Sequence, residues 1–104
     1  MSESNVLDGR ALKKVRLFAL GRLVATPGAL AALEENGKGC TEYLERHVRG
    51  EWGDLCDEDK LANDEAVAAG LRILSAYRLP DGERLWAITE ADRSVTTILL
   101  PAEY

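Results

Sequence analysis

The chain is poor in the residues on which small exported proteins and metal sites depend. Its 104 residues include two cysteines, one histidine and one methionine. Two cysteines are too few for the disulfide framework that stabilises small secreted domains. No cationic start with an apolar core marks an export signal, and no apolar run approaches the roughly 18 residues of a membrane span. We therefore expect a cytoplasmic protein with reduced thiols, a single domain over 1–104, and flexible residues 1–10.

The spacing of the few candidate ligands does not indicate zinc. Six residues separate Cys40 from His47 and eight separate His47 from Cys56, whereas structural zinc sites pair ligands about two to four residues apart. No fourth ligand is evident. We expect no metal and no cofactor, and we expect both cysteines to act as small buried apolar side chains.

Catalytic sequence motifs are missing as well. The chain has no phosphate-binding glycine-rich loop, no dinucleotide-binding fingerprint, and no serine in the context of a nucleophile elbow. In so short a chain these absences favour a non-enzymatic protein.

Negative charge predominates in the second half of the chain. Thirteen basic and eighteen acidic residues give a formal charge of −5, with +2 over residues 1–50 and −7 over residues 51–104. Affinity for nucleic acid comes from basic side chains that neutralise phosphates, so nucleic-acid binding is not expected. A basic cluster in the N-terminal segment keeps it open as an alternative (Arg10, Lys13, Lys14 and Arg16).

Acidic residues are densest between Glu51 and Glu65, where seven carboxylates accompany one lysine. Residues 57–59 are all acidic and stand where a helix is predicted to begin. Carboxylates there cap backbone amides and complement the helix dipole, which is the interpretation we favour. The alternative is that the segment imitates the phosphate backbone of DNA.

The order of the predicted elements indicates an α+β fold. Helices are expected over 26–35, 41–49 and 57–69. Thr26-Pro27 is a start signal for the first helix, and the three helices end at Asn36-Gly37, Gly50 and Gly70. We expect these three helices to pack on one face of a three- or four-stranded, mainly antiparallel sheet.

The last third of the chain changes its apolar period from 3.6 to 2. Three alternating runs cover 72–79, 84–89 and 94–100, and Asp81-Gly82 between the first two is a strong hairpin signal. These runs predict a C-terminal β-meander.

A further strand is predicted ahead of the helices, over residues 15–25. Both alternating sets of side chains in this segment contain apolar residues, which is typical of a strand buried on both faces. Gly21 permits a bulge there. A helix over the same residues is the competing interpretation.

Candidate catalytic residues are few. The single histidine, His47, is close in sequence to Asp54, and a carboxylate can orient an imidazole for acid–base catalysis. His47 also falls on an apolar helix stripe, so we favour a structural role. Glu90 and Asp92, at a predicted hairpin turn, are the other candidates and could hold a divalent cation. The alternative is that Asp92 caps its own backbone and Arg93 pairs with Glu90.

Candidate binding residues are aromatic or cationic. Trp52, Tyr77 and Trp86 would line an apolar pocket in a ligand-binding protein, and Arg93 would bind phosphate or carboxylate. For Trp52 we favour a place in the core.

Three segments carry a resemblance to a known family. They are 46–54 (RHVRGEWGD), 72–77 (RILSAY) and 86–101 (WAITEADRSVTTILLP). They resemble a family of small uncharacterised bacterial proteins carried on plasmids, genomic islands and other mobile elements. The resemblance extends more weakly over residues 17–104, and an aspartate commonly stands in the family where this chain has Glu51. It implies a genomic setting, and it indicates neither a mechanism nor the position of an active site.

Such proteins are sometimes labelled as the modification subunit of a type I restriction system. A methyltransferase needs a glycine-rich cofactor loop and an Asn-Pro-Pro-aromatic type of motif for its target base. This chain has neither, so the sequence does not support that label.

Taken together, these features favour a non-enzymatic accessory protein of a mobile element that binds another protein or forms a homodimer. One alternative is a small hydrolase or nuclease, which requires His47, Asp54, Glu90 or Asp92 to converge in one cleft. The other alternative is a small-molecule-binding module. No membrane partner is expected.

Overall fold

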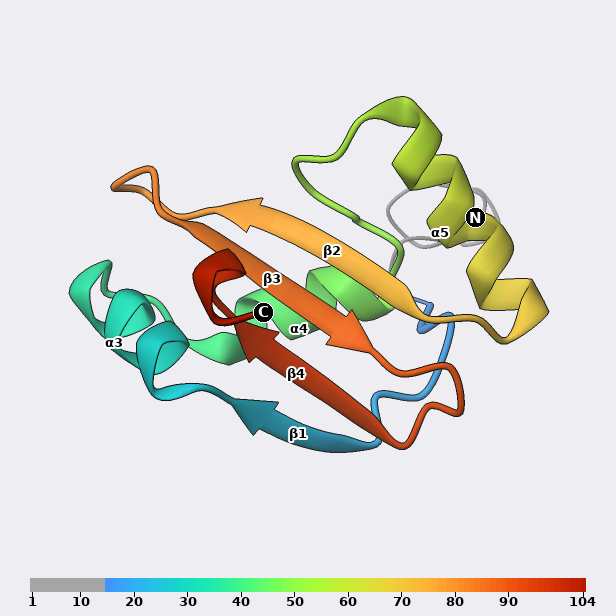
Figure 1. Ribbon diagram of the computed structural model, residues 1–104, viewed down its shortest axis with the longest axis horizontal. Coiled ribbons are helices and arrows are strands. Elements are labelled where there is room, and N and C mark those ends of the chain that lie inside the picture. Colours follow the sequence, from blue (N-terminus) through green and yellow to red (C-terminus); the bar gives the residue numbers. More distant parts are fainter. Residues whose placement is uncertain (1–14) are drawn as a thin grey trace, which may run out of the picture.

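The computed structural model describes residues 15–104 and confirms the α+β class (Figure 1). The predicted flexibility of residues 1–10, and Arg10, Lys13 and Lys14 of the basic cluster, lie outside the described residues. In chain order the elements are β1 (Arg22–Ala25), α3 (Pro27–Glu35), α4 (Cys40–Val48), α5 (Asp57–Ala69), β2 (Ile73–Arg78), β3 (Arg84–Thr89), β4 (Val95–Leu99) and the 3-10 turn η1 (Pro101–Glu103).

The sheet has the strand order β1-β4-β3-β2. The predicted meander is confirmed, because β2, β3 and β4 pair antiparallel, with Ser75 opposite Ala87 and Ala87 opposite Ile98. Strand β1 instead runs parallel to β4, with Val24 beside Thr97. A parallel pair needs a long crossover, and the segment that holds all three helices supplies it.

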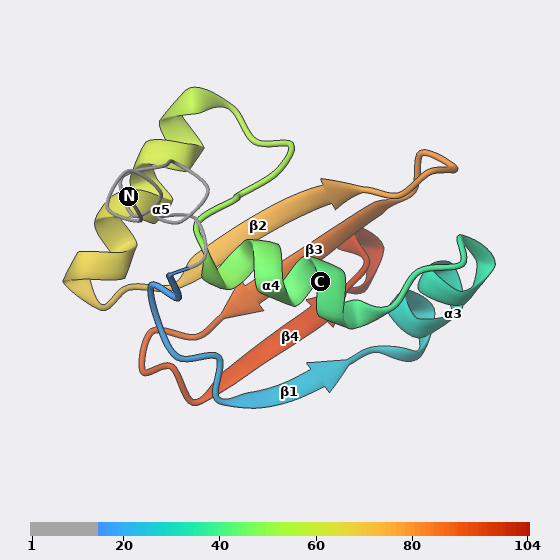
Figure 2. The same cartoon turned by 180° about the vertical axis from the view of Figure 1, so that it is seen from behind.

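Helix α4 lies across one face of the sheet, while α3 lies at one end and α5 lies along the β2 edge (Figures 1 and 2). All three helices contribute side chains to the core on the α4 face. The main cluster combines α3, α4 and the sheet, and a smaller one includes α5: Ala29, Ala32, Leu33, Tyr43, Leu44, Tyr77, Leu79, Leu85, Ala87 and Ile98; and Trp52, Ala66 and Ile73. The turn η1 lies against β3 on the opposite face.

The N-terminal strand is shorter and more exposed than predicted. Only Arg22–Ala25 is strand, and the side chains of Leu23 and Val24 are 55% and 42% exposed. The prediction of a strand buried on both faces was therefore wrong. The physical reason is that, within residues 15–104, β1 pairs with β4 alone. The chain also turns at Gly21 (φ +66°), where a side chain would collide with the backbone of Ser94.

The helix starts match the prediction in α3 and differ in α5. The Thr26 hydroxyl caps α3 by accepting a hydrogen bond from the N–H of Ala29 (3.1 Å). Helix α5 begins after Cys56, whose side chain makes no capping hydrogen bond. The acidic residues 57–59 are exposed in its first turn, so they complement the helix dipole without capping amides.

The β2 edge of the sheet is closed by other parts of the chain. The Asn63 amide of α5 donates to the carbonyl of Leu74 (2.7 Å) and accepts from its N–H (3.3 Å). Two residues further along, Ala76 donates to the carbonyl of Trp52 (3.1 Å) and accepts from the N–H of Asp54 (2.6 Å). These outward backbone groups are satisfied, so no further strand can pair with them.

Replacing Asn63 tests this closure. The Asn63→Leu substitution leaves the N–H and C=O of Leu74 without partners, and each unsatisfied buried group costs about 1–3 kcal/mol. We expect the free energy of unfolding, measured by urea denaturation, to fall by about 2–4 kcal/mol. Glu65→Leu, at an exposed position of the same helix, should change it by no more than about 0.5 kcal/mol. Equal stability of the two variants would contradict the prediction.

Candidate functional site

The predicted catalytic histidine lies deep in the core. His47 is on the side of α4 that faces the sheet, and its side chain is 0% exposed. Its Nδ1 is 2.6 Å from the Ser75 hydroxyl of β2, and its Nε2 is 2.9 Å from the Thr89 hydroxyl of β3. The rings of Phe18 and Trp52 lie against the imidazole, with centroids at 5.2 and 6.0 Å.

The hydrogen bonds through His47 run in one direction. The Thr96 hydroxyl donates to the carbonyl of Leu20 (2.7 Å), so it accepts from the Thr89 hydroxyl (2.7 Å). Since the proton of Thr89 is used in this way, Thr89 accepts from Nε2–H of His47. Nδ1 then accepts from Ser75. Counting protons in this order assigns a neutral imidazole that is protonated on Nε2.

Burial lowers the pKa of His47 to about 4, because the charged ring would lose its hydration. Both ring nitrogens bond to hydroxyl groups inside the protein. Among the described residues, none of the candidate carboxylates hydrogen-bonds to the ring. A buried imidazole with occupied nitrogens is poorly suited to remove a proton from a substrate.

Asp54 lies on the surface beside the β2–β3 hairpin. Its carboxylate is 2.9 Å from Arg78 and 3.2 Å from Arg84, which face each other across the two strands. The hydrogen bond from Arg78 and the charge of Arg84 lower the pKa of Asp54. Exposed ion pairs of this kind contribute little to stability. Asp54 contacts two arginines, whereas His47 contacts two hydroxyl groups, so the two side chains share no hydrogen-bond partner.

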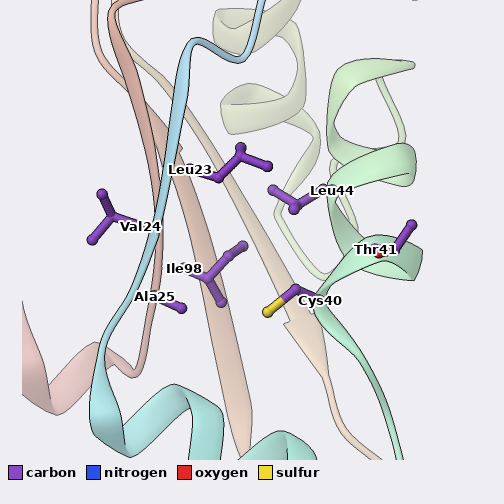
Figure 3. A pocket seen from close by; sticks show the side chains of 7 residues that line it. All are labelled: Leu23, Val24, Ala25, Cys40, Thr41, Leu44 and Ile98. Atoms are coloured by element: carbon purple, nitrogen blue, oxygen red, sulfur yellow. The ribbon is translucent and has the colours of Figure 1, made fainter.

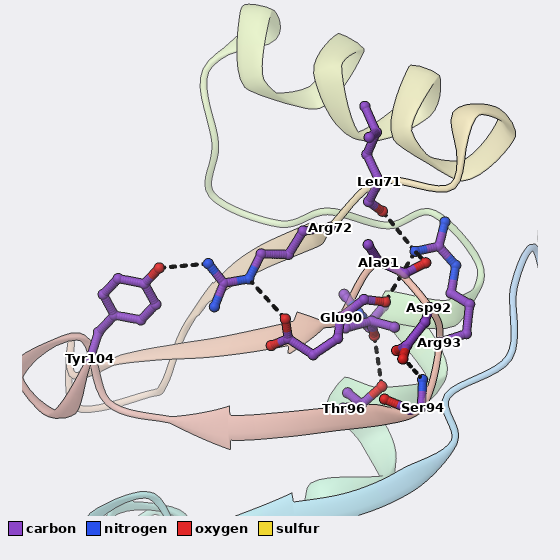
Figure 4. A network of polar contacts seen from close by, with 11 residues as sticks. Leu71, Arg72, Glu90, Ala91, Asp92, Arg93, Ser94, Thr96 and Tyr104 are labelled. Carbon is purple, nitrogen blue, oxygen red and sulfur yellow. Dashed lines mark hydrogen bonds and ion pairs between the residues drawn. The ribbon is translucent and has the colours of Figure 1, made fainter.

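The β3–β4 turn brings Glu90, Asp92 and Arg93 together (Figure 4). Asp92 accepts a hydrogen bond from the backbone N–H of Ser94 (3.0 Å), and hydrogen bonds from Ser94 lower the pKa of Asp92. This is the self-capping alternative predicted for Asp92. Arg93 pairs with Glu90 as predicted, but through the Glu90 backbone carbonyl, which accepts from the Arg93 N–H (2.9 Å) and guanidinium (3.2 Å). The Glu90 carboxylate instead lies 3.5 Å from the guanidinium of Arg72.

Arg93 binds backbone carbonyls. Its guanidinium donates to the carbonyls of Leu71 (2.7 Å) and Ala66 (3.0 Å), and more weakly to those of Glu90 and Ala91 (3.2 Å each). Ala66 lies near the end of α5, so Arg93 caps the helix C-terminus from the neighbouring turn. The same side chain that was a candidate for anion binding therefore joins α5 to the sheet.

The three aromatic binding candidates lie on two faces of the sheet. Trp52 and Tyr77 are buried on the α4 side, where Trp52 donates to Asp64 (2.9 Å) and Tyr77 donates to the carbonyl of Glu51 (2.7 Å). Burial raises the pKa of Tyr77 to about 12. Trp86 points to the opposite face and packs against the C-terminal ring at 5.6 Å between centroids. Trp52 is in the core, as favoured from the sequence, and the three rings line no common pocket.

Both cysteines are free thiols, and only one is partly covered. Cys40 is half-buried, whereas Cys56 is exposed ahead of α5, so the prediction of two buried cysteines was wrong. Within residues 15–104, no three His, Cys, Asp or Glu side chains are grouped to hold a metal ion. Over the same residues, none of the helices has the length and apolar character needed to cross a membrane.

The outer edge of β1 is the feature that sequence reasoning missed. The N–H of Arg22 donates to the carbonyl of Ser94 (2.9 Å), and the N–H of Thr26 likewise donates toward β4 (3.0 Å). Since backbone groups alternate along a strand, Leu23 and Ala25 direct their N–H and C=O away from β4. Among residues 15–104, no backbone or side-chain group pairs with them.

A groove of about 190 Å³ lies beside this edge, between β1 and α4 (Figure 3). Figure 3 shows Leu23 and Ala25 pointing toward α4, and Val24 pointing the other way. The lining is mainly apolar: Leu23, Val24, Ala25, Cys40, Thr41, Leu44 and Ile98. Sites for small molecules usually occupy roughly 300–1,000 Å³. A smaller groove along an open edge is better suited to the side chains of an added strand.

Comparisons of the chain with protein-family models, with curated proteins and with solved structures found no match.

The buried imidazole makes stability dependent on pH. The pKa of His47 is about 6.5 in the unfolded chain and about 4 in the native state. The unfolded state thus binds more protons in this window, so stability is lost as the pH falls. We expect the free energy of unfolding to be about 2 kcal/mol lower at pH 5 than at pH 7.

Urea denaturation at pH 7, 6 and 5 measures this dependence, and His47→Gln should remove most of it. If that variant does not fold, the ¹⁵N shifts of the wild-type imidazole at pH 6 provide a second test. They should report a neutral ring protonated on Nε2. A positively charged imidazolium, protonated on both nitrogens at pH 6, would show that the assignment is incorrect.

Proposed function

We propose that the protein acts by binding other protein chains at the β1 edge, where an extended segment of the partner adds a fifth strand to the sheet. The contrast between the two sheet edges carries this proposal. Asn63 and the segment 52–54 satisfy the outward groups of β2. Leu23 and Ala25 leave theirs open within residues 15–104.

The side chains of β1 support the same function. Proteins usually protect an open edge with lysine, proline or a bulge, because such an edge pairs readily with another chain. Leu23 and Ala25 are the residues of β1 whose backbone N–H and C=O point away from the sheet, and neither is a lysine or a proline. In strand addition the backbone supplies hydrogen bonds, while alternate side chains of the partner enter pockets beside the edge. The groove between β1 and α4 is placed to receive them.

The surroundings of the catalytic candidates favour binding over hydrolysis. His47 is buried with both nitrogens occupied, and Asp54 and Glu90 are engaged by different arginines. The resemblance to proteins of mobile elements implies a genomic setting in which a non-enzymatic accessory role is one possibility. We therefore propose such a role, exercised through protein–protein contact at β1.

A random peptide library displayed on phage tests the proposal. The full chain is immobilised at low density, so that its copies do not meet. We expect enrichment of peptides whose apolar residues alternate with period two. Ala25→Pro removes an outward N–H and keeps the donors that pair with β4, so it should weaken peptide binding at least about tenfold.

Ala25→Ser is the matched control, since it changes the same side chain and retains the N–H. It should bind the selected peptides much more tightly than Ala25→Pro does. Equal binding by Ala25→Pro, or no enrichment on the wild-type chain, would refute strand addition at this edge.

A further inference from the structure

We infer that a second copy of this chain is the partner that fits the β1 edge, with the two β1 strands antiparallel about a twofold axis at Val24. This inference rests on the proposed function of the edge, and it names the occupant. Such pairing would join two four-stranded sheets into one continuous sheet of eight strands. A twofold contact of this kind is closed, because the same surface is used on both copies.

The backbone favours one symmetric register. With the axis at Val24, Leu23 of each copy faces Ala25 of the other, and each facing pair exchanges two hydrogen bonds. All four outward groups of each strand are then satisfied. An axis at Leu23 would require Gly21 to extend the ladder, but Gly21 turns the chain at φ +66°. An axis at Ala25 would set Leu23 against Pro27, which has no N–H.

The side chains agree with this register. Leu23 and Ala25 point toward α4, so Leu23 of the second copy would lie next to the small side chain of Ala25. That position opens onto the groove and onto Cys40, which lines it. On the other face, Val24 would meet Val24 of the second copy. Both exposed apolar residues of β1, at 55% and 42% exposure, would lose their contact with water.

Charge is complementary in the same arrangement. Arg22 of one copy would lie opposite Thr26 of the other, because these positions are equally far from Val24. The Thr26 hydroxyl donates to the carboxylate of Glu103, which also accepts from the N–H of Gly28 (3.2 Å). Arg22 would thus approach Glu103 of the second copy. Within residues 15–104, Arg22 has no acidic partner of its own.

Two symmetric Arg22–Glu103 pairs would therefore flank the Val24 contact. They would offset, at the interface, the repulsion between two copies that each carry a formal charge of −5. A foreign strand satisfies the same backbone groups, but a second copy also places a carboxylate opposite Arg22 and a leucine beside Ala25. This is why we commit to self-association.

Analytical ultracentrifugation of the full chain over a range of concentrations is the first test. We expect a monomer–dimer equilibrium. Ala25→Pro removes one backbone donor from each copy and should weaken the dimer by about tenfold to a hundredfold. Ala25→Ser retains the backbone donor, so it should weaken the dimer much less than Ala25→Pro does. Arg22→Glu should also weaken it, and this effect should diminish at high salt.

A disulfide cross-link tests the register. With both native cysteines replaced by alanine, Val24→Cys places two thiols in a non-hydrogen-bonded pair, whose Cα atoms are about 4.5 Å apart and within disulfide range. It should give a covalent dimer on mild oxidation. Leu23→Cys is the matched control, because the two Leu23 positions are diagonal neighbours about 7–8 Å apart and should link poorly.

The outcomes separate this inference from the proposed function. A chain that stays monomeric at all concentrations yet binds the selected peptides through Ala25 would overturn the inference and leave the function standing. A dimer that is insensitive to Ala25→Pro and is not linked by Val24→Cys would also overturn it. If the chain is a monomer and the backbone amides of Leu23 and Ala25 exchange slowly, residues of the same chain cover the edge. That result would overturn both this inference and the proposed function.

Discussion

The hydrogen bonds that pass through His47 are the interaction on which the arrangement of this molecule depends. The imidazole joins α4 to β2 through Ser75 and to β3 through Thr89. Thr89 continues the chain to Thr96 of β4, and Thr96 reaches the carbonyl of Leu20, shortly before β1. A buried polar chain is stable only when every member has its partner. The position of α4 over the sheet, and hence the groove beside β1, is therefore closely defined.

The far end of β1 is held by the C-terminal turn. Thr26, which follows β1 and caps α3, donates to Glu103. The same carboxylate accepts from the backbone N–H groups of Gly28 and Leu100. Strand β1 is thus held at its start through the ladder with β4 and at its end by η1, while its outer side stays open within the described chain. An edge that is already extended loses little conformational freedom when another strand pairs with it, which favours association.

The small size of the chain explains why most candidate site residues have structural roles. A chain of 104 residues buries a modest core. Polar side chains that reach across elements, such as Asn63 and Arg93, satisfy backbone groups that the small core cannot. Trp52 and Tyr77 combine large apolar area with a polar group that also finds a partner. Several candidate site residues therefore make hydrogen bonds that hold the fold together: His47, Trp52, Tyr77 and Arg93.

Sequence reasoning succeeded where the signal is local. The Thr26-Pro27 start of α3, the end of α5 at Gly70 and the Asp81-Gly82 hairpin each depend on backbone preferences of a few adjacent residues. It failed where the outcome depends on distant neighbours. The apolar pattern of residues 15–25 cannot distinguish a central strand from an edge strand. The local pattern likewise does not reveal that Cys56 is exposed or that Glu90 pairs with Arg72, which lies ahead of β2.

The sequence by itself determined the helices, the meander and the turns between them, because capping, periodicity and turn chemistry act over a few residues. Only the tertiary structure decided that β1 lies parallel to β4 at the edge of the sheet and that His47 is enclosed and neutral. It also decided that, within residues 15–104, one sheet edge is closed while the other is open. The physical reason is that backbone pairing and desolvation between remote segments depend on which surfaces meet. No local pattern of residues specifies that.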